Sequence, residues 1–249
     1  MPPLFPSDKL LDRHAIRFAG RDTLPSEPRH GGRWESLPAY PLAPGVAGVL
    51  AGASAGMLLA AGGANFPDRP PWEGGVKKTY DDIFALPGDA VAWQAAGRLP
   101  EPRAYAAVVS TPRGVLVLGG ENAAGVRADS LWLQWKSGRV EVSPGPMLPG
   151  PLSSPVAALL DGWVYLAGGF QPGPPRTGTA GFSRFKLSDP AAGWQTLPTW
   201  PGPARGQAVI AAAAGAIYLF SGLELAASAD GKAAINYLND AYRYDTAQG

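Results

Sequence analysis

A pair of adjacent glycines that ends an apolar run recurs along this 249-residue chain, and it constrains the fold more than any other feature. The pairs are Gly62-Gly63, Gly119-Gly120 and Gly168-Gly169, and the fourth position keeps one glycine as Ser221-Gly222. A Leu-Pro pair keeps step with them, at 37–38, 99–100, 148–149 and 197–198. Two independent markers that share a period of about 50 residues identify a repeat protein.

A period of about 50 residues is that of kelch repeats, in which each unit is one four-stranded sheet. Such a sheet cannot bury both of its faces alone, so the units pack radially as the blades of a β-propeller. The chain has 33 Gly and 27 Pro, but it is 46% hydrophobic and its glycines fall at repeat positions. These residues therefore indicate turns rather than disorder. The sequence predicts an all-β, kelch-type β-propeller.

The repeats divide the chain into an irregular amino-terminal arm over 1–33 and a propeller over 34–249. The expected blades cover about 45–99, 100–148, 150–198 and 200–249, with inner strands near 46–50, 105–109, 156–160 and 207–212. Trp93 and Trp194 begin outer strands, but the last repeat has no such segment, whereas Trp34 begins one ahead of the first blade. Either the Trp34 segment completes a closed four-bladed ring, or four blades of a larger propeller are present. We favour the larger propeller.

Composition excludes several partners and cofactors. The net charge of +1 lacks the basic stripe that nucleic-acid binding requires. No segment reaches the ~18 apolar residues of a membrane-spanning helix. The chain has no Cys, and both histidines, His14 and His30, lie in the arm, so we expect no metal and no cofactor. The first residues do not resemble a secretory signal, which predicts a cytoplasmic protein.

Several motifs in residues 34–125 resemble one family. They are Gly45-Val-Ala-Gly-Val-Leu-Ala-Gly, Gly62-Gly-Ala-Asn-Phe-Pro-Asp, Pro71-Trp-Glu-Gly-Gly-Val-Lys-Lys, Tyr80-Asp-Asp-Ile, Pro102-Arg-Ala-Tyr-Ala and Gly119-Gly-Glu-Asn. Together they resemble the N-acetylneuraminate epimerases (sialic acid mutarotases), in their cyclically permuted bacterial branch. Residues 150–249 carry only general kelch features. The resemblance implies a six-bladed propeller, of which this chain has four blades, and an isomerase of carbohydrate metabolism that interconverts sialic acid anomers. It also leaves a periplasmic location open.

The sequence departs from the family at its catalytic segment. The family's proposed catalytic Glu and Arg lie in Asn-Gly-Glu-x-Lys-Pro-Gly-x-Arg, which does not occur here; Leu223-Glu224-Leu225 is the nearest similar stretch. Two functions therefore remain open. The chain is either a sugar mutarotase or a non-catalytic kelch module that binds a carbohydrate or a protein through its loops. We expect little or no acceleration of anomer equilibration by this chain.

Two residues are candidates for catalysis. Glu121 directly follows a double glycine, where the loops of a propeller gather, and could carry the proton between the anomeric hydroxyl and the ring oxygen. Alternatively, its carboxylate caps the loop amides. Arg103 precedes the inner strand of the second blade and could hold the carboxylate of a sialic acid through paired hydrogen bonds. Alternatively, Arg103 braces a loop after Pro102.

Further residues are candidates for substrate binding. Arg205 precedes the fourth inner strand as Arg103 precedes the second, with the same bracing alternative. Asn122 follows Glu121, and Asn65 occupies the comparable place in the first blade. Trp72 and Glu73 lie in a long loop, a frequent site of binding, where Trp72 could stack on a sugar or merely hold the loop. The aspartates near third strands, which are Asp81, Asp82, Asp129 and Asp240, are expected to bond turns within the blades.

Overall fold

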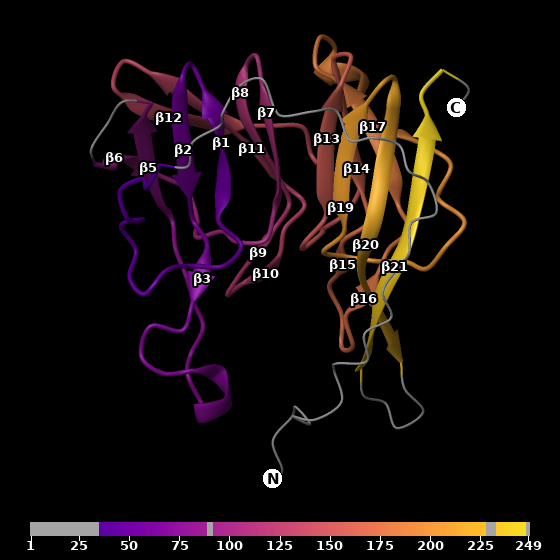
Figure 1. The fold of residues 1–249 in the computed structure, drawn as a ribbon, viewed down its shortest axis with the longest axis horizontal. Coiled ribbons are helices and arrows are strands. Elements are labelled where there is room, and N and C mark those ends of the chain that lie inside the picture. Colours follow the sequence, from indigo (N-terminus) through magenta and orange to yellow (C-terminus); the bar gives the residue numbers. More distant parts are fainter. Residues whose placement is uncertain (1–34, 89–91, 228–232, 248–249) are drawn as a thin grey trace, which may run out of the picture. The chain divides into compact units, whose positions relative to one another are not determined.

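The computed structural model describes residues 35–88, 92–227 and 233–247 of the chain, so the predicted arm over 1–33 lies outside the described residues. The described strands belong to one compact unit that begins at Pro38. They form antiparallel sheets in which the order in space largely follows the order in the chain (Figure 1). The predicted all-β class is confirmed.

Four sheets carry the core of the fold. The first contains β1 (Leu50–Ser54), β2 (Met57–Ala61), β5 (Asp82–Pro87) and β6 (Gln94–Arg98). The second contains β7 (Ala107–Thr111), β8 (Gly114–Leu118), β11 (Ser130–Lys136) and β12 (Arg139–Pro144). The third contains β13 (Val156–Leu160), β14 (Trp163–Ala167), β17 (Phe182–Lys186) and β18 (Gln195–Thr196). The fourth contains β19 (Val209–Ala213), β20 (Ala216–Ala227) and β21 (Ala233–Asp245). The first strands β1, β7, β13 and β19 contact one another in chain order.

Short two-stranded ribbons extend the first three sheets beyond their Gly-Gly pairs. They pair β3 (Ala64–Asn65) with β4 (Lys78–Thr79), β9 (Glu121–Asn122) with β10 (Gly125–Val126), and β15 (Phe170–Gln171) with β16 (Thr177–Gly178). In the fourth sheet the ribbon is continuous with β20 and β21 across a bulge between Phe220 and Gly222. Two 3₁₀ turns, η1 (Pro71–Glu73) and η2 (Pro190–Ala192), complete the described elements.

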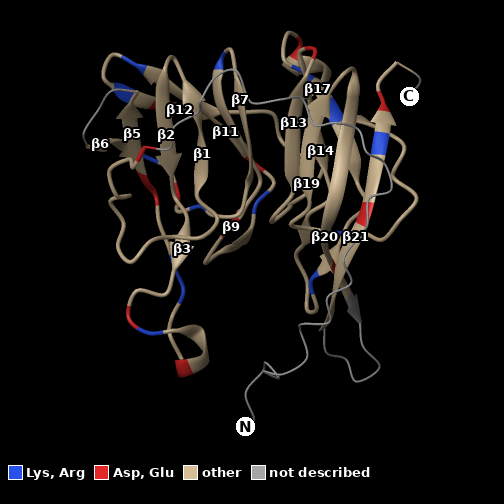
Figure 2. Ribbon diagram, viewed as in Figure 1, with Lys and Arg blue, Asp and Glu red and all other residues tan. Residues whose placement is uncertain are grey.

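The core lies between successive sheets, and the second strands of the two middle sheets, β8 and β14, are buried on both faces. In β8, Val115 and Val117 pack against the first sheet, while Leu116 and Leu118 pack against the third. This alternation is the period of two that a strand imposes on its side chains. A third cluster, around Tyr165 and Phe182, joins the third sheet to Ile217 and Leu219 of the fourth. Charged residues gather at strand ends and loops, and the strands are mostly uncharged (Figure 2).

One of the four predicted inner strands, over 156–160, has the expected bounds, as β13. The other three inner strands begin two to four residues later than predicted, because Gly48, Tyr105 and Gln207 have left-handed φ angles of 63°, 57° and 53°. A left-handed residue cannot continue an extended strand.

The Gly-Gly pairs join each sheet to the next. The backbone N–H groups of Gly63, Gly120 and Gly169 donate to the carbonyl oxygens of Arg103, Leu152 and Arg205 at 2.7–2.8 Å. These acceptors lie just ahead of the next sheet's first strand. Both members of each pair have positive φ, between 59° and 108°, which suits glycine. Ser221 adopts the same conformation but is exposed, so its side chain has room there.

The first glycine of each pair is expected to be sterically essential. A Cβ on Gly168 would lie 2.5 Å from the carbonyl oxygen of Arg205. Gly168→Ala should lower the free energy of unfolding by about 3 kcal/mol, from backbone strain and overpacking together. Gly162→Ala is the matched control, since its φ is also positive at 77° but nothing lies within 4 Å of the added Cβ; it should cost about 1 kcal/mol. Urea unfolding measures both, and equal losses would contradict the steric role of the joint.

Candidate functional site

The ribbons that follow the Gly-Gly pairs lie at the same end of the sheets, and the candidate site is built there (Figure 1). Equivalent positions are fixed by the bridges Ala47↔Ala64, Ala104↔Glu121, Ser153↔Phe170 and Gly206↔Leu223. At the position of Glu121, the other three sheets have the apolar residues Ala64, Phe170 and Leu223. A buried carboxylate at a position that is otherwise apolar needs polar partners.

Glu121 has those partners on both carboxylate oxygens. The Nζ atom of Lys77 lies 2.8 Å from Oε1, and Nη2 of Arg176 lies 2.7 Å from Oε2. The Ser153 hydroxyl donates to Oε2 at 2.7 Å. Lys77 precedes β4, Ser153 precedes β13, and Arg176 comes from the loop between β15 and β16. We call these four residues the Glu121 cluster; three different sheets contribute to it.

The electrostatics of the cluster favour a charged Glu121. Burial alone would raise the pKa of this carboxyl, but hydrogen bonds from Lys77, Ser153 and Arg176 outweigh it and lower the pKa below its usual value. Two cations thus surround one carboxylate. The side chains of Lys77 and Arg176 keep 37% and 42% of their surface exposed, whereas Glu121 keeps 11%. The cluster therefore presents surplus positive charge to the solvent, which suits an anion.

Lys77 is also held by an aromatic ring. Its Nζ lies 4.4 Å from the ring centroid of Tyr105, a distance typical of a cation–π contact. The Tyr105 ring packs closely against Gly48, where a Cβ would lie 2.6 Å from a ring carbon. The backbone of the first sheet thus supports the ring that supports Lys77. This stacking fixes where the ammonium group meets Glu121.

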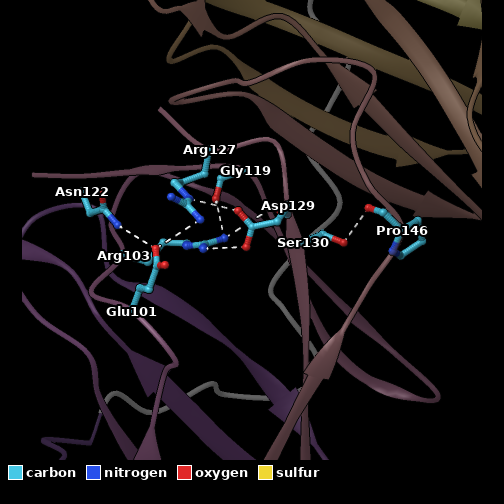
Figure 3. A network of polar contacts seen from close by, with 8 residues as sticks. All are labelled: Glu101, Arg103, Gly119, Asn122, Arg127, Asp129, Ser130 and Pro146. Atoms are coloured by element: carbon cyan, nitrogen blue, oxygen red, sulfur yellow. Dashed lines mark hydrogen bonds and ion pairs between the residues drawn. The ribbon is translucent and has the colours of Figure 1, made fainter. Parts of the chain in front are cut away.

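Arg103, by contrast, is buried within the second sheet (Figure 3). Its side chain is 2% exposed, and Nη2 lies 2.8 Å from Oδ2 of Asp129. Its Nη1 atom donates to the carbonyl oxygen of Gly119 at 3.3 Å. Asp129 also accepts from Nε of Arg127 at 3.1 Å, and Arg127 pairs with Glu101 at 3.2 Å. These contacts correspond to the bracing alternative of the sequence analysis.

Arg205 repeats this arrangement in the fourth sheet. Its side chain is fully buried, and Nη2 lies 2.8 Å from Oδ2 of Asp240. The Tyr242 hydroxyl donates to the same oxygen at 2.8 Å. Strand register places Arg205 and Asp240 at the positions of Arg103 and Asp129, and the third sheet has Leu152 and Gly181 there instead. The first sheet has Asp82 at the aspartate position but Val46 at the arginine position. Each buried arginine thus has its aspartate, which agrees with a bracing role.

The other predicted binding residues lie apart from the cluster's charged groups. Asn122 caps its own turn by accepting from the N–H of Ala124 at 2.9 Å, and it donates to Glu101 at 3.3 Å. Asn65 donates to the Gly45 carbonyl at 2.8 Å and accepts from Tyr80 at 2.9 Å. Trp72 and Glu73 lie in η1, where Trp72 is 81% exposed. Their described contacts do not include Glu121.

Sequence reasoning found Glu121 but missed its three partners. Lys77 lies within the Pro71–Lys78 motif that carries the family resemblance, yet only Trp72 and Glu73 were selected there. Arg176 follows the third Gly-Gly pair in a Pro-rich loop. Both residues could have been predicted as partners of Glu121, because each is a basic residue in a loop after a Gly-Gly pair and all such loops reach the same end of the sheets. Ser153 had no comparable signal.

No group of three or more His, Cys, Asp and Glu side chains lies close enough to bind a metal ion within the described ranges. None of the helices described in the structure is long and apolar enough to cross a membrane.

Comparison with known proteins shows which family the chain resembles. Residues 145–249 match the family model of N-acetylneuraminate epimerase. The chain is similar to the N-acetylneuraminate epimerases over part of its length. The enzyme of that name from Yersinia enterocolitica is 36% identical over 110 residues, covering 39% of this chain and 27% of that protein. The one from Brucella suis is 39% identical over 101 residues, covering 36% and 26%. The matches thus span about a quarter of the length of these relatives.

A solved structure supports the fold. The structure described as "Structure of YjhT" aligns with a TM-score of 0.69 and 12% identity, over 85% of this chain and 72% of that one. The β-propeller fold is thereby confirmed, as is the predicted resemblance to the epimerase family. The location of the resemblance is corrected, however. The family model matches the third and fourth sheets, which the sequence analysis assigned only general kelch features, and residues 34–125 lie outside the matched range.

The buried arginine pairs should control acid stability. Arg205 holds the pKa of Asp240 at about 2, below its ordinary value near 4. A depressed pKa contributes stability above the unfolded value and loses it as pH falls towards the folded one, here from about 4 to about 2. Asp240→Asn should cost about 3 kcal/mol at neutral pH, because it leaves Arg205 without its counter-charge. It should also remove part of the stability loss between those pH values.

Asp81→Asn is the control for this change, because Asp81 pairs with Arg98, whose side chain is 68% exposed. It should cost at most about 1 kcal/mol, as is usual for surface pairs. Thermal unfolding at a series of pH values measures both variants. Similar losses in the two variants at neutral pH would mean that the buried pair is no more important than a surface pair.

Proposed function

We propose that the Glu121 cluster binds a carboxylated sugar of the N-acetylneuraminate type and that Glu121 is its proton-transfer group. The observation that carries this proposal is the meeting of a buried carboxylate with two part-exposed cations from separate sheets. Cations bind the acid group of such a sugar, and a carboxylate beside them can move a proton on the sugar itself. The names of the relatives point to the same substrate class.

Mutarotation requires only proton transfers and the breaking and re-forming of one bond. A base removes the proton of the anomeric hydroxyl, the bond from the anomeric carbon to the ring oxygen breaks, and the ring oxygen takes up a proton. Rotation and the reverse steps close the other anomer. In this proposal Glu121 accepts the first proton and returns one to the ring oxygen. Arg176 and Lys77 hold the substrate carboxylate so that the anomeric centre stays within reach, which is the positioning contribution to catalysis.

The rate expected from this geometry is small. A general base works best when its pKa lies near the working pH, whereas the pKa of Glu121 is lowered for as long as Lys77, Ser153 and Arg176 contact it. Both of its carboxylate oxygens are engaged by these contacts, which a substrate would first have to replace. The sequence lacks the family's Glu and Arg segment as well. We therefore propose binding with weak catalysis.

A binding module without catalysis is the second candidate. The observation that favours it is a set of exposed apolar side chains on the loops and on the β20–β21 ribbon. Trp72 is 81% exposed, Val76 76%, Ile235 54% and Tyr237 84%. Exposed aromatic and apolar residues on loops are typical of surfaces that bind a carbohydrate or a protein. In that case the sugar would bind, but its anomers would equilibrate at the uncatalysed rate.

Anomer equilibration followed by NMR distinguishes a weak mutarotase from a binding module without catalysis. Fresh α-anomer of N-acetylneuraminate should show protein-dependent line broadening, and any acceleration with the native chain should be slight. Glu121→Gln should abolish the acceleration, since a positioned base contributes about 10²–10⁴-fold where it acts. Arg176→Gln should mainly weaken binding. Glu141→Gln, at an exposed pair with Lys136, is the control and should change neither.

Two outcomes would contradict the proposal. Acceleration that persists in Glu121→Gln would place the proton-transfer group elsewhere. Binding that is unaffected by Arg176→Gln would place the carboxylate elsewhere. Binding without any acceleration in the native chain would favour the non-catalytic module.

A further inference from the structure

We infer that Glu121 is an internal competitor for the anion site formed by Lys77, Arg176 and Ser153, and that an incoming anion displaces it. This inference rests on the proposed function for the choice of site, but it makes a separate statement about how the site is occupied. The Glu121 carboxylate makes the contacts that a ligand carboxylate would make.

The geometry of the cluster is that of a bound carboxylate. Its two oxygens receive separate cations at 2.8 Å and 2.7 Å, and a hydroxyl donates to one of them at 2.7 Å. These are the short distances of charge-assisted hydrogen bonds. The receptor groups come from elements outside β9, whereas Glu121 begins that strand. A ligand anion can therefore meet the same donors from the solvent side, where Lys77 and Arg176 are part-exposed.

The charges make simultaneous binding unfavourable. Two carboxylates that share one site repel each other strongly when both are ionised and partly desolvated. Arg176 has five N–H donors and Lys77 has three, so the cations have enough donors for an incoming anion. The negative charge of Glu121 is what competes with the incoming anion, and protonation of Glu121 removes the repulsion. Anion binding and protonation of Glu121 are thus coupled.

The groups that face Glu121 from the packed elements determine the sign of this coupling. They are Lys77 with the Tyr105 ring beneath it, Ser153 ahead of β13, and Arg176 in the β15–β16 loop. The cations and the hydroxyl keep the pKa of Glu121 low while they contact it. Once an anion takes those contacts, burial and the neighbouring negative charge raise the pKa of Glu121. Anion binding should therefore take up a proton and strengthen as pH falls toward the ordinary carboxyl range.

Sulfate is the probe that tests this inference without a sugar, because it stays ionised across the range. Glu121→Gln should bind sulfate about tenfold more tightly than the native chain at pH 7, since the internal competitor loses its charge. Arg176→Gln and Lys77→Gln should weaken sulfate binding. Glu141→Gln is the matched control and should leave it unchanged. NMR titration of the folded proteins gives these affinities, and circular dichroism verifies that each variant is folded.

Proton uptake supplies a second readout. Calorimetry of sulfate binding at pH 5, in two buffers that differ in ionisation enthalpy, should show uptake by the native chain and none by Glu121→Gln. Equal or weaker sulfate binding by folded Glu121→Gln would overturn the inference, as would binding by the native chain without proton uptake. If sulfate behaves as expected but N-acetylneuraminate does not bind, the proposed function fails while the internal competitor stands. If the sugar binds but Glu121→Gln leaves sulfate affinity unchanged, the internal competitor is contradicted while the proposed function stands.

Discussion

The hydrogen bond from the second glycine of each pair to the start of the next sheet is the contact on which the structure depends. It joins Gly63 to Arg103, Gly120 to Leu152 and Gly169 to Arg205. Each bond satisfies a backbone donor and acceptor where the sheets meet, and no side chain fits between them. The apolar faces of adjacent sheets are then held in register, so that β8 packs its alternate residues into two different cores. The repeat in the sequence is therefore a repeat of joints between blades.

The same joints build the polar network inside the blades. The residue whose carbonyl accepts from the glycine is an arginine at the joints after the first and third sheets. Its side chain turns inward and is neutralised by an aspartate of its own sheet: Asp129 directly precedes β11, and Asp240 lies in β21. Where the joint residue is Leu152, the opposite position is Gly181, and neither charge is present. An arginine buried here without its aspartate would be costly, which explains why the two residues occur together.

The sequence predicted the fold well because period and turn chemistry are local signals. Gly-Gly pairs, Leu-Pro pairs and the apolar runs between them located the sheets, and located β13 to the residue. The starts of other inner strands were missed, because the left-handed conformation of Tyr105 and Gln207 has no marker in residue type. For the site, Glu121 was found from its place after a glycine pair. Its contacts with Lys77 and Arg176 were not, because they bridge 44 and 55 residues of chain and depend on how the blades pack.

Comparison between the repeats also explains why this one position carries chemistry. Four equivalent bridges, one in each sheet, provide an internal reference for this position. Glu121 stands where the other sheets have Ala64, Phe170 and Leu223, and Ser153 stands where they have Ala47, Ala104 and Gly206. The two polar departures are neighbours, joined by the hydrogen bond between them at 2.7 Å. The other sheets form the same bridge without polar side chains at these two positions, so the polar residues are not needed to join the blades. Their presence together, facing two cations from separate loops, is what a binding site requires and a joint does not.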